Sequence, residues 1–211
     1  MTQRRTVLGL GLASLGLMTT SCGGGGGLGS VLADVGSGGT GSTTIGPVSG
    51  FGSVIVGGLR YDDSAALITD DSGAALSSSS LGLGMMVRVD GTLSDASNGK
   101  ATTIRVTSQL LGPVTAIDAT AGSFTVLGQT ARLTATTVYS GFTSLAGLAL
   151  GDTVEVWGVL DAANATVTAT RVELKTAATG SYKLVGTVTA VDAARSRCTI
   201  GALTVAYAGA S

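Results

Sequence analysis

From Gly46 onward, apolar and polar positions alternate in short runs that glycines separate. Runs such as Val54-Ile55-Val56 and Phe124-Thr125-Val126 are rich in β-branched or aromatic residues, and a period of two is that of a strand with one buried face. Gly57-Gly58 stands between two such runs, which is typical of a two-residue hairpin turn. The pattern predicts an all-β protein in which short strands are joined by tight turns.

The stretch from residue 112 to residue 174 contains the elements of one folding unit. Five short strands with a brief non-strand element before the fourth favour a small closed barrel, similar to the oligonucleotide/oligosaccharide-binding (OB) barrel. An SH3-like barrel or a sandwich is the alternative. The predicted strands are Val114–Ile117, Phe124–Leu127, Ala131–Leu133, Thr153–Leu160 and Val167–Leu174, with the short turn at Ser144–Leu148.

The unit is repeated in tandem. The motif Gly-Pro/Thr-Val-Ser/Thr begins at Gly46, Gly112 and Gly186, a spacing of about seventy residues that is too long for a solenoid repeat. A second motif confirms the register, since Leu83–Leu93 matches Leu150–Leu160. We expect module 1 over residues 45–110, module 2 over residues 111–176 and a partial module 3, its first hairpin only, over residues 182–211. This last piece is either part of a longer protein, which we favour, or a hairpin added to module 2.

The N-terminal residues predict export. A basic pair, Arg4-Arg5, precedes an apolar run from Val7 to Met18 and small residues before Cys22. The apolar run is short for a membrane span, so we expect a signal peptide over residues 1–21. It resembles a bacterial lipoprotein signal, which implies that Cys22 becomes the lipidated first residue and that the chain's membrane partner is reached through this anchor. The arginine pair fits a twin-arginine motif and an ordinary secretory signal equally well.

Residues 22–44 are nearly all glycine, serine and threonine, apart from a short apolar patch at Val31–Val35. Such a composition behaves as a flexible coil. We therefore expect a tether between the lipid anchor and the modules. The expected location is the cell envelope, as an outer-membrane or periplasm-facing lipoprotein.

Composition narrows the class of function. The chain has 12 Lys and Arg, 13 Asp and Glu, no His, and a formal net charge of −1. Nucleic-acid binding relies on clustered Lys and Arg, so we expect no nucleic-acid partner. A chain without histidine has no Ser-His-Asp triad and no His-ligated zinc. We expect no catalytic residues, no metal and no cofactor, and the alternative is a carboxylate- or metal-dependent envelope enzyme.

The remaining chemical candidates have ordinary explanations. Asp62-Asp63 and Asp70-Asp71 could be read as calcium ligands, but they lack the alternating spacing and the closing glutamate of a calcium loop. Aspartates beside serine and glycine are typical turn formers. Cys198 aligns with the strand position of Phe124, which favours a small apolar residue over a reactive thiol.

Trp157 is the only tryptophan and the one candidate binding residue of the modules. Along Val154-Glu155-Val156-Trp157, alternation places the two valines on one face and the glutamate and tryptophan on the other. The matching positions of module 1 are Arg88 and Asp90. Trp157 is therefore either an exposed anchor for a partner or a plug between adjacent modules, and we favour the plug. In both cases it should lie off its own module's core.

These motifs together resemble the bacterial family called domain of unknown function 5666 (DUF5666). The resemblance implies an exported protein, often a lipoprotein, with several copies in tandem, and it supplies no site residues because the family has no established activity. Module 1 departs from the pattern where Met85 replaces Asp152. We expect a lipid-anchored envelope protein whose β modules have a binding or structural role toward an unidentified protein or glycan. The segments that carry the resemblance are Gly112–Asp118, Phe124–Gly128, Leu148–Gly158 and Ala169–Glu173.

Overall fold

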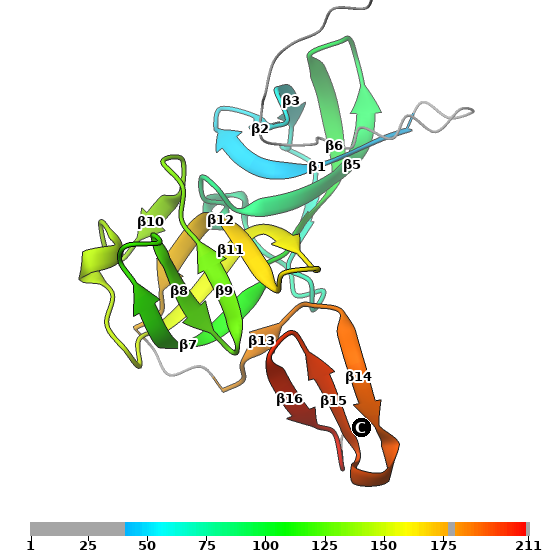
Figure 1. Cartoon of the computed structure of the whole chain (residues 1–211). Helices are drawn as coiled ribbons and strands as arrows, with labels where there is room; N and C mark the ends of the chain where they lie inside the picture. The colour runs from blue at the N-terminus through cyan, green and yellow to red at the C-terminus, as the bar shows by residue number, and fades with distance from the viewer. Residues whose placement is uncertain (1–40, 177–179, 210–211) are drawn as a thin grey trace, which may run out of the picture.

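The computed structural model describes residues 41–176 and 180–209, so the predicted signal peptide and Cys22 lie outside the described residues. In the described part, strands form three sheets, each drawn as a separate body in Figure 1. The only helical elements there are three short 3-10 turns. The all-β prediction is confirmed. None of the helices in these residues is long and apolar enough to cross a membrane.

Module 1 is a six-stranded sheet in the order β3-β2-β1-β5-β6-β4. A further parallel pairing between β3 and β6 joins the ends of the five-stranded path and closes it into a barrel. The elements are β1 (Gly41–Gly50), β2 (Val54–Val56), β3 (Leu59–Asp62), β4 (Leu67–Thr69), η1 (Ser78–Ser80), β5 (Met86–Leu93) and β6 (Asn98–Val106).

The first strand starts earlier than the sequence predicts. Residues Gly41–Thr44, expected to end the tether, pair with β5 as part of β1. Thr44 is fully buried, and its hydroxyl lies 2.6 Å from the hydroxyl of Tyr61 in the core. The prediction of a flexible tether is therefore wrong for its last four residues. They form a strand although their sequence is polar and contains glycine, because pairing with β5 and this buried hydrogen bond stabilise them there.

Module 2 repeats this plan. Its sheet runs β10-β12-β11-β7-β8-β9, and a parallel pairing joins β9 to β12 as β3 is joined to β6. The predicted strands and the short turn all occur, and one further strand, β10, was not predicted. The elements are β7 (Leu110–Asp118), β8 (Ser123–Val126), β9 (Gln129–Arg132), β10 (Val138–Ser140), η2 (Leu145–Gly147), β11 (Thr153–Asp161) and β12 (Thr166–Leu174).

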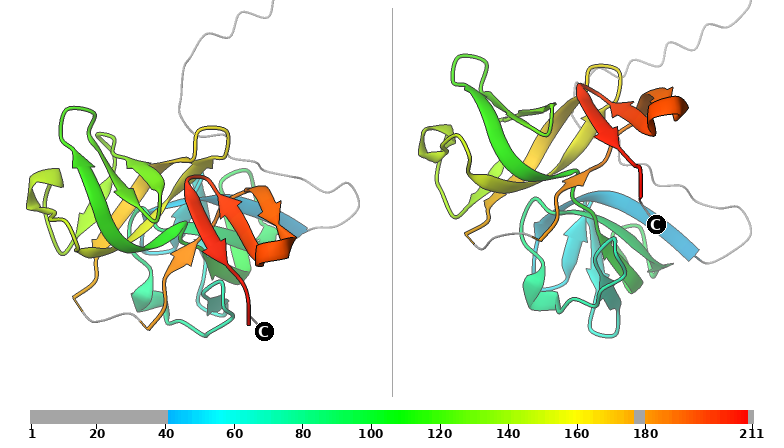
Figure 2. Two further views of the ribbon diagram at one scale, coloured as in Figure 1. Left: turned by 60° about the horizontal axis from the view of Figure 1, so that its bottom comes forward. Right: turned by 90° about the horizontal axis from the view of Figure 1, so that it is seen from below.

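The residues after module 2 form a sheet of their own. A short strand, β13 (Lys183–Leu184), pairs with β7 and ties the chain to module 2. The chain then continues into a three-stranded antiparallel sheet beside module 2, here called the third sheet (Figure 2). It holds three strands and not the single hairpin predicted. Its elements are β14 (Val188–Asp192), η3 (Ala193–Arg195), β15 (Arg197–Ile200) and β16 (Leu203–Ala206).

Each complete module has its own core, and the boundary between them differs slightly from the prediction. Leu110, expected to end module 1, is fully buried in the core of module 2 as the first residue of β7. It belongs there because it pairs with Val156 of β11. Val156 and Val126 of the same core are also fully buried.

The first strands of modules 1 and 2 and of the third sheet share one local irregularity. Each of these strands bulges at the residue after the motif valine. That residue is Ser49, Thr115 or Thr189, and its hydroxyl donates to a carbonyl of the opposite strand at 3.2, 3.2 and 3.3 Å. A bulge leaves one residue without its ladder partner, and the hydroxyl supplies a hydrogen bond at that point.

Candidate functional site

The junction between modules 1 and 2 contains the one predicted site residue that the structure describes. Trp157 lies on β11, where it pairs with Arg171 while Gly158 pairs with Ala169, so Thr170 is a bulge on the opposite strand β12. Val154 and Val156 of the same strand belong to the core of module 2, whereas Trp157 belongs to the buried cluster of module 1. Alternation along the strand thus places the tryptophan off its own core, as predicted, and one strand contributes to two cores.

The side chain of Trp157 is buried. Its exposed fraction is 3 %, so it occupies the position of the predicted plug and not that of an exposed anchor. Two cations flank the ring, with Arg171 and Lys175 lying 5.8 and 5.7 Å from its centre. Cations at this distance from an indole face are attracted to it, more strongly when they are shielded from water.

A turn of module 1 supplies the other side of the junction. The carbonyl of Gly84 accepts a hydrogen bond from the Thr170 hydroxyl at 2.6 Å, and the carbonyl of Leu83 accepts one from Arg171 at 3.2 Å. Gly84 has φ +79°, and a Cβ there would stand 2.4 Å from the carbonyl oxygen of Thr170. Glycine is therefore required at this position for two reasons: the backbone has a positive φ, and β12 approaches too closely for a side chain.

Charges alternate across β11 and β12 beside the tryptophan. Glu155 and Glu173 are direct cross-strand partners, and Lys175 lies between them, 2.7 Å from one carboxylate and 2.8 Å from the other. Arg171 completes the chain with a 2.9 Å contact to Glu173. Like charges directly opposite one another repel, so the lysine and the arginine are what allow the two glutamates to share this face.

Burial and pairing compete in setting the pKa values of this network. Burial alone would raise the pKa of Glu173, but hydrogen bonds from Lys175 and Arg171 outweigh it and hold that pKa below its usual value of 4.5. Burial alone would lower the pKa of Lys175, but Glu155 and Glu173 raise it above its usual value of 10.5. Glu173 and Lys175 are therefore held in their charged forms at neutral pH.

A second junction ties the segment around β13 to both modules. Lys183 forms an ion pair with Asp71 of module 1, and its ammonium donates to the Ser108 hydroxyl at 3.1 Å. Burial lowers the pKa of this lysine. The third sheet is then held by Gln129, whose side-chain amide donates to the carbonyl of Ile200 at 3.1 Å.

The carboxylates considered as calcium ligands shape loops. Asp62 accepts a hydrogen bond from the backbone N–H of Ser64, and that bond lowers its pKa. Asp70 accepts from the hydroxyl and backbone N–H of Ser72, with the hydroxyl contributing most to its lowered pKa. Asp63 is half-buried in the turn after β3, and Asp71 pairs with a lysine as described above. Within residues 41–176 and 180–209, no three His, Cys, Asp or Glu side chains gather as metal ligands would.

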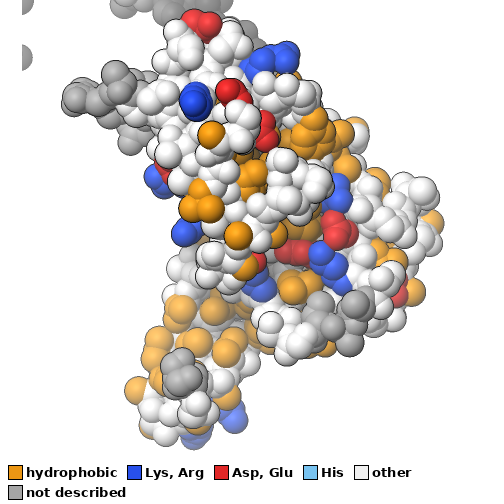
Figure 3. Space-filling view, turned by 180° about the vertical axis from the view of Figure 1, so that it is seen from behind, with side chains coloured by type: hydrophobic (Ala, Val, Ile, Leu, Met, Phe, Trp, Pro, Cys, Tyr) orange, Lys and Arg blue, Asp and Glu red, His pale blue; other side chains and the backbone are white. Residues whose placement is uncertain are grey.

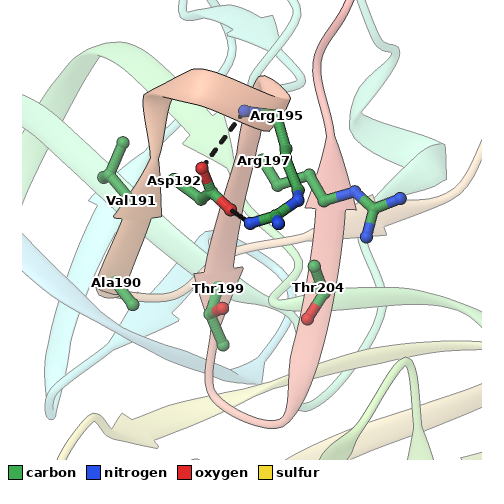
Figure 4. Close-up of a pocket in the computed structure, with 7 residues that line it drawn as sticks. All are labelled: Ala190, Val191, Asp192, Arg195, Arg197, Thr199 and Thr204. Atoms are coloured by element: carbon green, nitrogen blue, oxygen red, sulfur yellow. Dashed lines mark hydrogen bonds and ion pairs between the residues drawn. The ribbon is translucent and has the colours of Figure 1, made fainter.

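A concavity of about 360 Å³ lies on the polar face of the third sheet (Figure 4). Asp192 accepts there from the backbone N–H of Arg195 at 3.1 Å and pairs with its guanidinium at 2.9 Å. Arg197, Thr199 and Thr204 line the same face. Cys198 lies half-buried on the opposite, apolar face, in register with Val191 and Val205.

The fold and the junction define an all-β protein with a closed five-stranded barrel, in which a strand of module 2 also contributes a side chain to the core of module 1. Residues 112–173, which run from β7 into β12, match the family described as Domain of unknown function (DUF5666). The match supports the resemblance seen in the sequence for module 2. No curated protein and no solved structure matches the chain.

Proposed function

We propose that this is a lipid-anchored protein of the bacterial cell envelope in which tandem OB-like barrels form a rigid arm. The arm has a binding or structural role toward a protein or glycan partner. The anchor is Cys22, at the end of a segment with the order of charge, apolar run and small residues of an exported lipoprotein signal. The export route is the twin-arginine or the general secretory one.

Strand order supports the OB-like assignment. In module 1 the first strand pairs with the second and with β5, and β3 pairs in parallel with β6. The same three relations hold in module 2 among β7, β8, β9, β11 and β12. A five-stranded ring of this kind is the pattern of the OB barrel.

The observation that carries the proposed role is the junction itself. Trp157 packs into the neighbouring core, and the carbonyls of Leu83 and Gly84 accept hydrogen bonds from Arg171 and Thr170. Domains joined only by a linker move independently, whereas these contacts fix one module against the next. A fixed series of modules on a tether suits a protein that holds a binding surface away from the membrane.

Rigidity can be measured as a distance distribution between spin labels at equivalent hairpin tips. Ala96 and Ala162 are both exposed and lie in the β5–β6 and β11–β12 turns, so each is replaced by cysteine after Cys22 and Cys198 are replaced by serine. We expect a single narrow distribution that broadens in Trp157→Ala. A broad distribution in the otherwise native chain would show that the modules are independent and would overturn the rigid arm.

Anchoring is tested in the exporting cell. The native chain should fractionate with membranes, and its N-terminal peptide should carry the mass of a lipid-modified cysteine. Cys22→Ala should release the protein into the soluble fraction, while Cys198→Ala, the matched control at the other cysteine, should not. Membrane fractionation that Cys22→Ala leaves unchanged would refute the anchor.

A further inference from the structure

Three buried polar atoms at the junction have no hydrogen-bond partner among the described residues. They are the indole Nε1 of Trp157, the Nε of Arg171 and the amide oxygen of Gln109. Buried polar groups in native proteins are almost always hydrogen-bonded, either to protein or to an ordered water, because an unpaired group loses its contacts with solvent without replacement. No other buried side-chain nitrogen or oxygen in residues 41–176 and 180–209 is unpaired.

The three residues are neighbours on the sheet of module 2. Trp157 and Arg171 are direct cross-strand partners on β11 and β12. On the other side of β11, the backbone N–H of Gln109 donates to the carbonyl of Val156 at 2.8 Å, directly before the tryptophan. β7, which begins just after Gln109, and β12 flank β11 in the sheet. The tryptophan therefore lies between the other two residues.

The two donors are fixed in place by their surroundings. The ring of Trp157 is packed into the cluster of module 1. One terminal nitrogen of Arg171 donates to the carbonyl of Leu83 at 3.2 Å, and the other donates to Glu173 at 2.9 Å. Because a guanidinium is planar, these two bonds also fix the direction of its Nε–H. The guanidinium carbon lies 5.8 Å from the centre of the indole ring, so the two donors are close to each other.

The same row of module 1 is completed by the protein itself. Asp90 stands where module 2 has Trp157, and its cross-strand partners are Thr43 and Thr103. Both hydroxyls donate to the Asp90 carboxylate, at 2.6 and 3.4 Å. A carboxylate accepts hydrogen bonds from both sides, whereas an indole can only donate. The row of module 2 therefore lacks the central acceptor that the row of module 1 has.

The chemistry of the three unpaired atoms defines the ligand that completes the row. The two nitrogens are donors only and the amide oxygen is an acceptor only, so the ligand must accept two hydrogen bonds and donate one. An anion would face the lone pairs of the Gln109 oxygen, and a cation would face Arg171 and Lys175. Water accepts two hydrogen bonds and donates two, and a buried water makes about three of them to groups that are otherwise unpaired.

We propose that one water molecule is bound inside the junction as part of the folded structure. It accepts hydrogen bonds from Nε1 of Trp157 and Nε of Arg171, and it donates one to the amide oxygen of Gln109. The water joins β7, β11 and β12 beside the point where module 2 packs against module 1, so Gln109 is a positioning residue of the junction that acts through it. This goes beyond the proposed binding role, because it requires neither the lipid anchor nor a partner.

The charged network beside the tryptophan gives this water a route to solvent. The side chains of Lys175, Glu155 and Glu173 are 27, 20 and 24 % exposed. Figure 3 shows acidic and basic side chains gathered where the two barrels meet. The site thus lies behind a polar edge, and exchange of the bound water with solvent requires movement of these side chains. We therefore expect a bound water that exchanges slowly.

The test is an NMR measurement on the full chain, labelled with ¹⁵N and carrying Cys22→Ala. The only tryptophan gives a single indole N–H signal, so its contacts with water are read without ambiguity. Contact with a slowly exchanging bound water gives cross-peaks of opposite sign in NOESY and ROESY spectra, whereas proton exchange with solvent gives the same sign in both. We expect the signs of contact at the indole N–H and at the Nε–H of Arg171.

Gln109→Leu removes the acceptor and should abolish both cross-peaks, because the water then has no group to receive its hydrogen. A hydroxyl whose proton exchanges with solvent, such as that of Thr170, would still give them, so this variant separates a bound water from a relayed signal. Gln129→Leu is the matched control at the other described glutamine, which bonds to Ile200, and it should leave both cross-peaks unchanged. If Gln109→Leu does not fold, Gln109→Met, which keeps the length of the side chain without its acceptor, takes its place.

The proposal is overturned if the native chain shows no cross-peak between the indole N–H and water, or only one with the signs of exchange. It is also overturned if the folded Gln109→Leu or Gln109→Met variant keeps the native cross-peaks, since the amide oxygen would then not bind the water.

Discussion

Removal of the Trp157 ring should destabilise module 1, although the residue itself lies on β11 of module 2. A tryptophan buries roughly 150–250 Å², and at about 25 cal/mol per Å² this corresponds to an upper bound of about 4–6 kcal/mol. Substitutions of buried tryptophan by alanine cost about 3–5 kcal/mol in protein cores. Because Trp157 belongs to the cluster of module 1, we expect Trp157→Ala to lower the stability of β1–β6 by about 3 kcal/mol or more.

The indole nitrogen of Trp157 allows the effect of a second substitution, Trp157→Phe, to be predicted. It is buried, and no protein group among the described residues accepts its hydrogen. Trp157→Phe retains much of the packing and removes a polar group that is costly to bury, so its cost should be smaller, about 1 kcal/mol by the range for shape changes in cores. Val159→Ala is the matched control on the same strand, since this side chain is 58 % exposed, and we expect a change within about 0.5 kcal/mol.

Native-state hydrogen exchange is the suitable assay because it reports each module separately. Trp157→Ala should speed exchange in residues 41–106 more than in residues 110–174. In the native chain, emission from the only tryptophan should be blue-shifted and resistant to quenchers. Red-shifted, freely quenched emission, or equal loss of protection in both modules, would refute the assignment of Trp157 to the neighbouring core.

Two further predictions use the junction. Gly84→Ala should cost at least about 2 kcal/mol more than Gly151→Ala in urea unfolding, because both glycines have positive φ but only the first would place a Cβ against Thr170; equal costs would contradict the docking of this turn. Stability should be flat at neutral pH and fall at both extremes. The pKa of Glu173 is lower in the folded state, so its contribution is complete above pH 4.5 and is lost as pH falls through the folded value. The pKa of Lys175 is raised, so its contribution is complete below pH 10.5 and is lost as pH rises through the folded value. Thermal unfolding across pH checks this, and an acid limb unaltered by Glu173→Gln would contradict it.

The elements that local pattern determines were predictable. The alternation of apolar and polar residues in Val154–Trp157 and Val167–Thr170 predicts β11 and β12, and the tight turn at Gly57-Gly58 follows from two residues that tolerate positive φ. The off-core position of Trp157 follows from the same alternation. Each of these depends on residues adjacent in sequence, so no knowledge of long-range contacts is needed.

Elements decided by distant contacts were not predictable. β10, over Val138–Ser140, is three half-buried residues whose only strand partner is β12. Gly41–Thr44 resemble the glycine- and serine-rich segment before them, and only pairing with β5 makes them a strand. At the junction, the groups that accept hydrogen bonds on module 1 are the carbonyls of Leu83 and Gly84. A backbone carbonyl leaves no signature in the sequence.

Because β11 contributes side chains to two cores, modules 1 and 2 are not interchangeable along the chain. The junction depends on a tryptophan that module 2 has and module 1 lacks, since Asp90 stands at the matching position. The two modules are thus not equivalent at this position, and their order along the chain cannot be permuted freely. Excision of module 1 would leave module 2 foldable in principle but with a bare indole on its surface. Duplicating or shuffling these modules therefore requires a matching turn and a matching aromatic at every new boundary.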